Sequence, residues 1–192
     1  MKFLHLRDHI YAMVDDEDYG LASQYKYYAA QRGRRIYAAR RYQRNCVVYH
    51  TFLHHDVLGT TAKEIAPLVV DHKDRNPLNC CKGNLRLCTR AENNYNRIPN
   101  RNGTSKYKGV FYFSGKGGRD RLTKPWLVQL RKEGKTYYFG YFASEYQAAM
   151  MANVHAYRLF GRFAYLNNWT GPTPKNQIPG SDPPQAKERK IS

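Results

Sequence analysis

Short runs of β-branched and aromatic residues alternate with polar turn-forming residues along the first part of the chain. The four runs are IYAMV, KYYAA, RRIYAARRY and CVVYHTFL, and breaks such as Gly33 separate them. Runs of this length and composition are typical of β-strands. The pattern therefore predicts a small β-rich N-terminal module over residues 1–60, in which the acidic cluster Asp15–Asp18 forms a turn.

The pattern changes over residues 61–100. A short apolar strand, LVVD, is followed by the polar loop DRNPLNCCKGN and by a second short strand, LRLC. Thr89 precedes Glu92 by the spacing of a capping box, so we expect a helix that begins at Thr89 and runs towards Pro99. A strand–loop–strand–helix unit of about forty residues is too small to fold without support from the rest of the chain.

A third unit is predicted over residues 105–169, after a polar linker at 100–104. Its strand candidates are KYKGVFYF, KPWLVQLRK and KTYYFGYF, and a tight turn at Glu133–Lys135 joins the last two as a hairpin. A helix follows, with a capping box at Ser144 and Gln147.

Small side chains recur at helical spacing in this last helix, which lets it lie close on a sheet. His155 belongs to the same stripe, so we expect it to be a core or boundary residue and not a ligand. Gly161 is placed to end the helix. The remaining segment, 170–192, contains five of the nine prolines and is expected to be disordered.

Charge narrows the choice of partner. The chain of 192 residues has 32 Lys and Arg against 15 Asp and Glu, a formal net charge of +17. Self-repulsion of this size favours a protein that binds a polyanion, and nucleic acid is the expected one. Seven basic residues and no acidic residue lie between Lys26 and Tyr49. This basic run is either a ribbon that binds a nucleic-acid backbone or the solvated face of a hairpin.

Hydropathy and cysteine content exclude other classes. Mean hydropathy is −0.77 and no apolar run approaches the roughly 18 residues of a membrane-spanning helix. The start, MKFLHLRDH, is broken by charged residues and does not fit a secretory signal. The four cysteines contain no CxxC pair and are expected to be reduced. We expect a soluble protein of the cytoplasm of a bacterial or phage-infected cell, with no membrane partner and no evident protein partner.

The candidate chemistry lies in the strand–loop–strand–helix unit. Asp71 and His72 end its first strand, Asn84 precedes its second strand, and Asn93 lies one turn inside its helix. Folding the strands onto the helix would bring Asp71 and Asn93 together as oxygen ligands of a divalent cation, with Mg²⁺ the expected ion. His72 would then deprotonate a water molecule beside the cation, and Asn84 could fix the tautomer of its ring.

The string DHKD…N…GNLRL.T…N, within residues 69–97, resembles the HNH (ββα-metal) nuclease motif of phage homing endonucleases. This resemblance implies that His72 is the general base, that Asp71 and Asn93 bind the metal, and that Asn84 positions His72. The upstream segment also resembles the module that often precedes this motif.

Two positions of the loop depart from the family pattern. The usual glycine after the Asp-His pair is Arg75 in this chain, and a frequent second asparagine is Cys80. Both departures concern the shape of the loop, because all four residues of the catalytic set are present.

Residues 105–168 resemble the ethylene-response-factor (APETALA-type) DNA-binding domain, through a GV dipeptide, an aromatic-led second strand, a GxF turn and a final LN. In that family a three-stranded sheet lies in the major groove and a helix packs behind it. Alternation along the strands separates a core face from a groove face. The expected DNA contacts are Lys108, Gln129, Arg131 and Tyr138. Phe111 and Phe113 stand where the plant domains have arginines.

Together these observations predict an α+β protein that acts as a metal-dependent HNH endonuclease. It would bind double-stranded DNA sequence-specifically through its last unit, hydrolyse a phosphodiester bond, and nick one strand as a homing-endonuclease-like enzyme. The alternative is a non-catalytic, sequence-specific DNA-binding regulator. A protein that binds structured RNA is a third possibility, given the charge and the 17 tyrosines.

Overall fold

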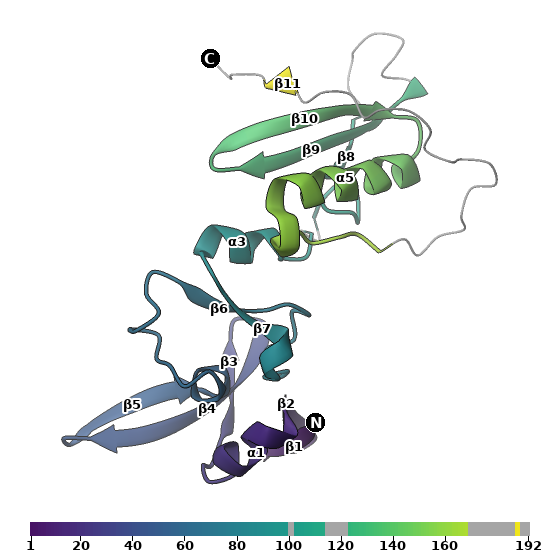
Figure 1. Ribbon diagram of the computed structural model, residues 1–192. Coiled ribbons are helices and arrows are strands. Elements are labelled where there is room, and N and C mark those ends of the chain that lie inside the picture. Colours follow the sequence, from purple (N-terminus) through teal and green to yellow (C-terminus); the bar gives the residue numbers. More distant parts are fainter. Residues whose placement is uncertain (100–101, 114–122, 169–186, 189–192) are drawn as a thin grey trace. The chain divides into compact units, whose positions relative to one another are not determined.

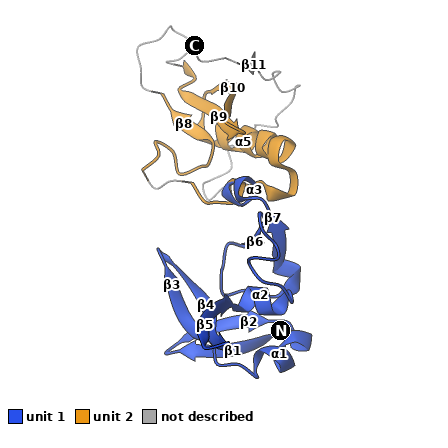
Figure 2. Ribbon diagram, turned by 90° about the vertical axis from the view of Figure 1, so that its left-hand side faces the viewer, with its two compact units in different colours: residues 1–94 blue, residues 95–192 orange. Residues whose placement is uncertain are grey.

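The computed structural model describes residues 1–99, 102–113, 123–168 and 187–188, in two compact units (Figures 1 and 2). Unit 1 is Met1–Asn94 and unit 2 is Tyr95–Ser192. Both combine helices with small antiparallel sheets, in agreement with the α+β class. Unit 1 contains the expected N-terminal module together with the expected nuclease motif, so the division at residue 60 is not visible as a separate compact body.

Unit 1 is built from three small antiparallel sheets. The strands are β1 (Lys2–Arg7) with β2 (Ile10–Val14), then β3 (Tyr28–Arg32), β4 (Arg35–Arg44) and β5 (Val47–Phe52), and finally β6 (Val69–His72) with β7 (Leu85–Cys88). The helices are α1 (Asp16–Ala22), α2 (Leu53–Val57), the single 3₁₀ turn η1 (Lys82–Asn84) and α3 (Arg90–Tyr95). Strands β2 to β7 follow the predicted apolar runs to within a few residues, whereas β1 was not predicted.

The acidic cluster at Asp15–Asp18 begins helix α1, and the expectation of a turn there was wrong. Three acidic side chains lie in the first turn of this helix, where they complement the positive end of its dipole. The cluster also holds Lys82, whose backbone N–H donates to Asp15 at 2.8 Å and whose ammonium lies 2.7 Å from Asp18. The N-terminal module is thereby fastened to the loop that precedes β7.

One hydrophobic core joins the N-terminal strands to the predicted nuclease motif. Its buried members come from β1, β2, β4, α1, α2, the β6–β7 connection and β7, and include Leu4, Val14, Ala38, Leu53, Cys80 and Leu85. Backbone bonds add to this packing, since Met13 donates to Leu78 and accepts from Cys80 at 2.7 and 2.8 Å. The small ββα motif therefore has the support that its size requires.

Unit 2 is an antiparallel sheet with one long helix on its core face. The elements are β8 (Val110–Tyr112), β9 (Trp126–Lys132), β10 (Lys135–Phe142), α5 (Glu145–Phe160), η2 (Gly161–Phe163) and β11 (Lys187–Glu188), and the sheet order is β11-β10-β9-β8. The predicted β9–β10 hairpin is confirmed. The expected disordered tail, 170–192, lies outside the described residues except for β11.

The helix α5 begins and packs as the sequence predicted. The Ser144 hydroxyl accepts a hydrogen bond from the Gln147 N–H at 3.2 Å, and Gly161 has φ 54° at the C-terminal end. The small residues of the helix pack with Val128, Leu130 and Phe139. His155 stacks on Phe139 with ring centroids 3.8 Å apart, which confirms its core position. Within the described residues, no helix is long and apolar enough to cross a membrane.

Candidate active site

Pairing of β6 with β7 places Asp71 opposite Arg86 and His72 opposite Leu85. Asp71 is only 5% exposed. Its Oδ2 accepts hydrogen bonds from Arg86 Nε at 2.8 Å and from Arg86 Nη2 at 2.6 Å. The expected metal-binding carboxylate is thus neutralised by a buried guanidinium that sequence reasoning did not identify.

His72 is buried beside other rings. Its ring centroid lies 5.2 Å from that of His54, at the start of α2, and 6.4 Å from that of Tyr37 on β4. Burial lowers the pKa of His72 to about 4, and the charge of Arg35 acts in the same direction against the opposing effects of nearby carboxylates. The imidazole is therefore neutral at physiological pH, the form in which it can accept a proton.

Asn84 shapes the loop between β6 and β7. Its Oδ1 accepts from the Asp74 N–H at 3.0 Å, and its Nδ2 donates to Asp74 Oδ1 at 2.9 Å and to the Asn79 carbonyl at 2.8 Å. We expected this amide to hold the His72 ring. In the structure its side-chain hydrogen bonds go to the loop, and it reaches the neighbourhood of His72 through its backbone carbonyl, which accepts from the Lys73 N–H.

Asp74 completes the same loop network. Its carboxylate accepts from the Asn76 N–H at 2.9 Å and from Asn79 Nδ2 at 2.8 Å. Partial burial acts to raise the pKa of Asp74, but these donors together with Asn84 bring it below its ordinary value. Arg75 adopts φ 67°, the left-handed conformation that favours glycine. The family's usual glycine at this position thus has a physical reason, and this chain supplies an arginine in the same conformation.

Asn93 lies half-buried on α3, which begins with the predicted capping box. The Thr89 N–H donates to Glu92 at 2.8 Å, and the Glu92 N–H donates to the Thr89 hydroxyl at 3.1 Å. Cys88 connects this helix to Asp71. Burial and the Asp71 charge raise the pKa of the Cys88 thiol to about 11, while a hydrogen bond from the Asn93 backbone opposes them. Asp71 and the start of α3 therefore share a neighbour.

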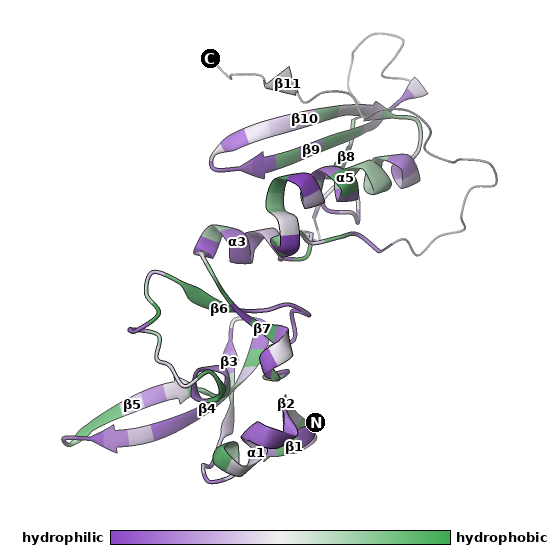
Figure 3. Cartoon of the chain, viewed as in Figure 1, coloured by the Kyte–Doolittle hydropathy of each residue, from purple (hydrophilic) through white to green (hydrophobic). Residues whose placement is uncertain are grey.

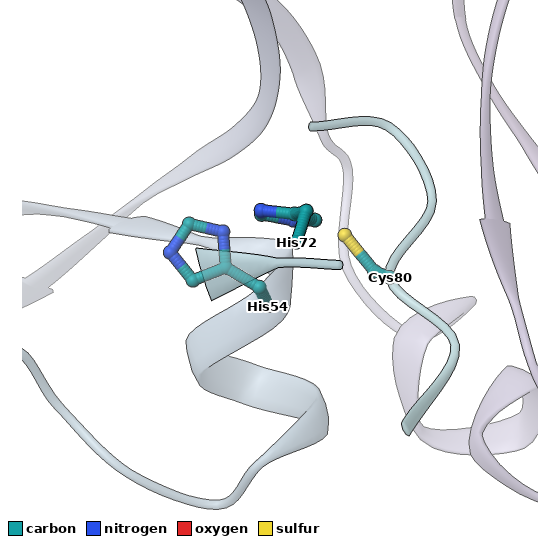
Figure 4. Close-up of side chains that lie close together, drawn as sticks. All are labelled: His54, His72 and Cys80. Carbon is teal, nitrogen blue, oxygen red and sulfur yellow. The ribbon is translucent and has the colours of Figure 1, made fainter. Parts of the chain in front are cut away.

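Figure 4 shows His54, His72 and Cys80 lying close together from three separate segments. Their potential ligand atoms are all within 4.8 Å of one another, and all three side chains are buried. Two imidazoles and a thiol suit a soft ion such as Zn²⁺ rather than Mg²⁺, which prefers oxygen. Burial raises the pKa of the Cys80 thiol to about 12, so the sulfur is protonated and is not yet a metal ligand.

A cavity of about 610 Å³ opens beside His54. Its lining includes His54, His55, Arg32 and Arg90. Nδ1 of His55 is buried and has no hydrogen-bond partner among the described residues. The rest of the lining is apolar or aromatic and comes from Tyr37, Phe52, Ala62 and residues 65–70, so the two arginines are its charged groups.

The expected DNA contacts in unit 2 divide into two groups. Gln129 and Tyr138 are register partners on β9 and β10, and Arg131 is two residues along on the same face, opposite the buried Val128 and Leu130. Lys108 differs from them. Its ammonium donates to the backbone carbonyls of Tyr95 at 2.7 Å and Arg97 at 2.8 Å, so it holds the chain at the end of α3.

The main residues missed from the sequence are His54 and Arg86. Arg86 is separated from Asp71 by 15 positions, and only the register of β6 and β7 reveals the pair. His54 lies next to His55 in the apolar segment after β5, which is the one signal that marks it.

The burial of His54 predicts a pH dependence of stability. Burial lowers its pKa to about 3, and the neighbouring His72 and His55 act in the same direction. The unfolded chain therefore binds a proton that the folded chain does not, and stability is complete above about pH 6.5 and falls as the pH drops towards 3. Urea titrations at several pH values give the free energy of unfolding as a function of pH. Between pH 3 and 6.5, we expect the slope of this free energy against pH to be about 1.4 kcal/mol per pH unit smaller in the His54→Gln variant than in the parent. The exposed His9→Gln is the control, and equal slopes for both variants would contradict the assignment.

Comparisons with known proteins identify the family of the chain. Residues 64–95 match a family model described as HNH endonuclease. The chain is 30% identical over 157 residues to an uncharacterized HNH endonuclease of Acanthamoeba polyphaga mimivirus, an alignment that spans 82% of this chain and 74% of that protein. No solved structure matches the chain. The chain therefore belongs to the HNH endonuclease family, and the protein is an endonuclease.

Proposed function

We propose that this endonuclease hydrolyses one strand of double-stranded DNA with His72 as the general base, and that it recognises its target through the sheet of unit 2. The observation that carries the proposal is the buried, neutral His72 immediately after Asp71 on β6, inside the segment that matches the HNH family. Each chain has one such centre and would cut one DNA strand, so a monomer would nick the duplex.

His72 acts by accepting the proton of the attacking water. Its neutral imidazole has the lone pair that accepts this proton. Asn84 accepts hydrogen bonds from the backbone N–H groups of Lys73 and Asp74 and so holds the chain that follows His72. Removal of a positioned base of this kind costs about 10²–10⁴-fold in rate. Cleavage would be limited to one position because the enzyme binds its target sequence more tightly than other DNA.

Asp71 and Asn93 are the proposed ligands of the divalent ion that this family uses. One carboxylate and one amide oxygen form a hard donor set, which fits Mg²⁺ better than the soft set of His54, His72 and Cys80 does. The bound ion would stabilise negative charge on the leaving oxygen. In the structure Arg86 supplies positive charge to the same carboxylate, so ion and guanidinium compete for Asp71.

The outer face of the unit 2 sheet is the proposed target-reading surface. From 105 to 169 the chain has eleven Lys and Arg against three acidic residues. Gln129, Arg131 and Tyr138 share the face that α5 does not cover. An exposed apolar side chain, Phe111, lies near them on β8, which favours contacts with bases and thymine methyl groups beside phosphate contacts. A homing role would follow from such site-specific nicking.

The catalytic assignment predicts the outcome of a plasmid assay. With Mg²⁺, the parent protein should convert supercoiled plasmid carrying its target into open circle. His72→Ala should lower the nicking rate about 10²–10⁴-fold while DNA binding persists. Asn93→Ala should also abolish nicking, whereas Asn94→Ala, its exposed neighbour on α3, should not. Parental nicking by a folded His72→Ala protein would show that another group is the base, and binding without any cutting by the parent would favour a regulator.

The proposed metal site predicts a link between Arg86 and Mg²⁺. Arg86→Met should cost about 3–5 kcal/mol, because Asp71 is left as a buried, unpaired charge. Added Mg²⁺ should then raise the melting temperature of this variant more than that of the parent. Arg90→Met is the matched control, and the Asp71→Asn/Arg86→Met double variant should regain stability and lose the Mg²⁺ response. An equal response in all four proteins would exclude Asp71 as a ligand.

The target-reading surface predicts a loss of affinity that depends on sequence. On a target selected with the parent protein, Arg131→Ala and Tyr138→Ala should each cost about 1–3 kcal/mol of binding free energy, and less on random duplex DNA. Arg158→Ala, on the exposed side of α5, is the control with the same change of charge. Equal losses on target and random DNA would assign this face to phosphate contacts alone, and tighter binding to structured RNA would count against a DNA substrate.

A further inference from the structure

The far end of the β4–β5 hairpin, Arg41–His50, stands away from the body of unit 1 (Figure 1). We call this segment the arm. Every residue of the arm is exposed. Strand β3 pairs with β4 only as far as Ala39, so the arm is a two-stranded ribbon. The Tyr28 side chain reaches only its root, where it contacts Arg41 and His50. A ribbon of this kind is marginal in water by itself, which suggests that it has a partner.

The chemistry of the arm fits a polyanion. No acidic residue occurs between Asp18 and Asp56, and Arg41 and Arg44 lie on the arm itself. Figure 3 shows the hydrophilic course of β4 beside a hydrophobic tip on β5. That tip consists of Val47 and Val48, which are 50% and 57% exposed. Cations along the strand and apolar groups at the tip match phosphates flanking the base edges of a groove.

The arm has a fixed shape. Tyr42 and Tyr49 are register partners and stack with ring centroids 5.3 Å apart. At its root, Arg40 donates two hydrogen bonds to Asp56 at 2.8 and 2.9 Å, and the turn residues at the tip are Asn45 and Cys46, both with positive φ. A tight turn of this type adds little width, and a two-stranded ribbon fits the major groove, which is about 12 Å wide.

We propose that the arm is a second DNA-binding element, which enters the major groove of the duplex on one side of the nicked phosphodiester. This inference rests on the proposed function and specifies how that site holds its substrate. The arm is connected to the site by β4 itself, because Tyr37 contacts His72 and the same strand continues to the tip.

The strand sets the distance. Asn45 lies eight positions after Tyr37, and at about 3.3 Å per residue this stretch of strand spans about 26 Å. Duplex DNA advances about 3.4 Å per base pair, so the tip lies about eight base pairs from the point where Tyr37 contacts His72. The arm should therefore protect about eight base pairs of DNA on one side of the nick.

A shortened arm tests the proposal. Deletion of Gln43, Arg44, Val47 and Val48 removes two register pairs, keeps the turn, and preserves the alternation of side chains. In hydroxyl-radical footprints without added divalent ion, we expect one edge of the protected region to retreat by about two base pairs. The position of the nick, measured separately with Mg²⁺, should not change.

Charge removal gives an independent measurement. The Arg41→Ala/Arg44→Ala variant should lower the slope of log affinity against log salt by about 0.9 for each phosphate that the arm no longer neutralises. Arg7→Ala/Lys63→Ala removes the same charge from exposed positions of unit 1 and should leave both footprint and slope unchanged.

Several outcomes would overturn the inference. These are an unchanged footprint edge in the shortened protein, equal slopes for the two charge variants, an effect on RNA binding alone, or a change in oligomeric state without a change in DNA binding. Failure of the proposed function is separate: if His72→Ala still nicks but the footprint edge retreats, the base is wrong and the arm stands.

Discussion

A buried, ionised carboxylate is costly unless it is paired and hydrogen-bonded, and Arg86 does both for Asp71. The pair bridges β6 and β7 at one register position, so a slip of one residue would separate the charges and turn His72 to the other face. The ion pair thus helps to fix the register of the hairpin that carries His72. It also keeps the centre close to electroneutral before any metal ion binds.

The loop and the N-terminal strands provide the remaining support. A ββα unit of this size has too little apolar surface for a core of its own, and here it shares one with β1, β2, β4 and α2. The side chains of Asn84 and Asp74 then accept hydrogen bonds from backbone N–H groups of the connecting loop. These bonds hold the conformation of the chain just after His72. The N-terminal module is therefore part of the catalytic scaffold, and its basic hairpin is carried by the same strand that contacts His72.

Much of the fold could be predicted from local patterns in the sequence. Pairings between distant residues could not. The strands β7 and β10, the capping box at Thr89 and the start of α5 follow from composition and spacing over a few residues. The acidic cluster misled because residues that favour turns also favour helix N-termini. Its true partner, Lys82, is 67 positions away from Asp15. The family pattern named the catalytic set, but the partners of Asp71 and Asn84 depend on strand register and loop shape, which spacing alone does not encode.

The proposed DNA-binding surfaces, the arm of unit 1 and the sheet of unit 2, would contribute differently to affinity and to specificity. Contacts with phosphates act on any duplex and weaken with salt, whereas contacts with base edges distinguish sequences. The arm brings arginines and a few apolar atoms, and the unit 2 sheet brings an amide, a guanidinium and aromatic rings on one face. Because one chain joins them, binding by either unit raises the effective concentration of the other at the same duplex. Modest contacts on each side would therefore add up to stable binding in the proposed mechanism, in which His72 acts on a single phosphodiester.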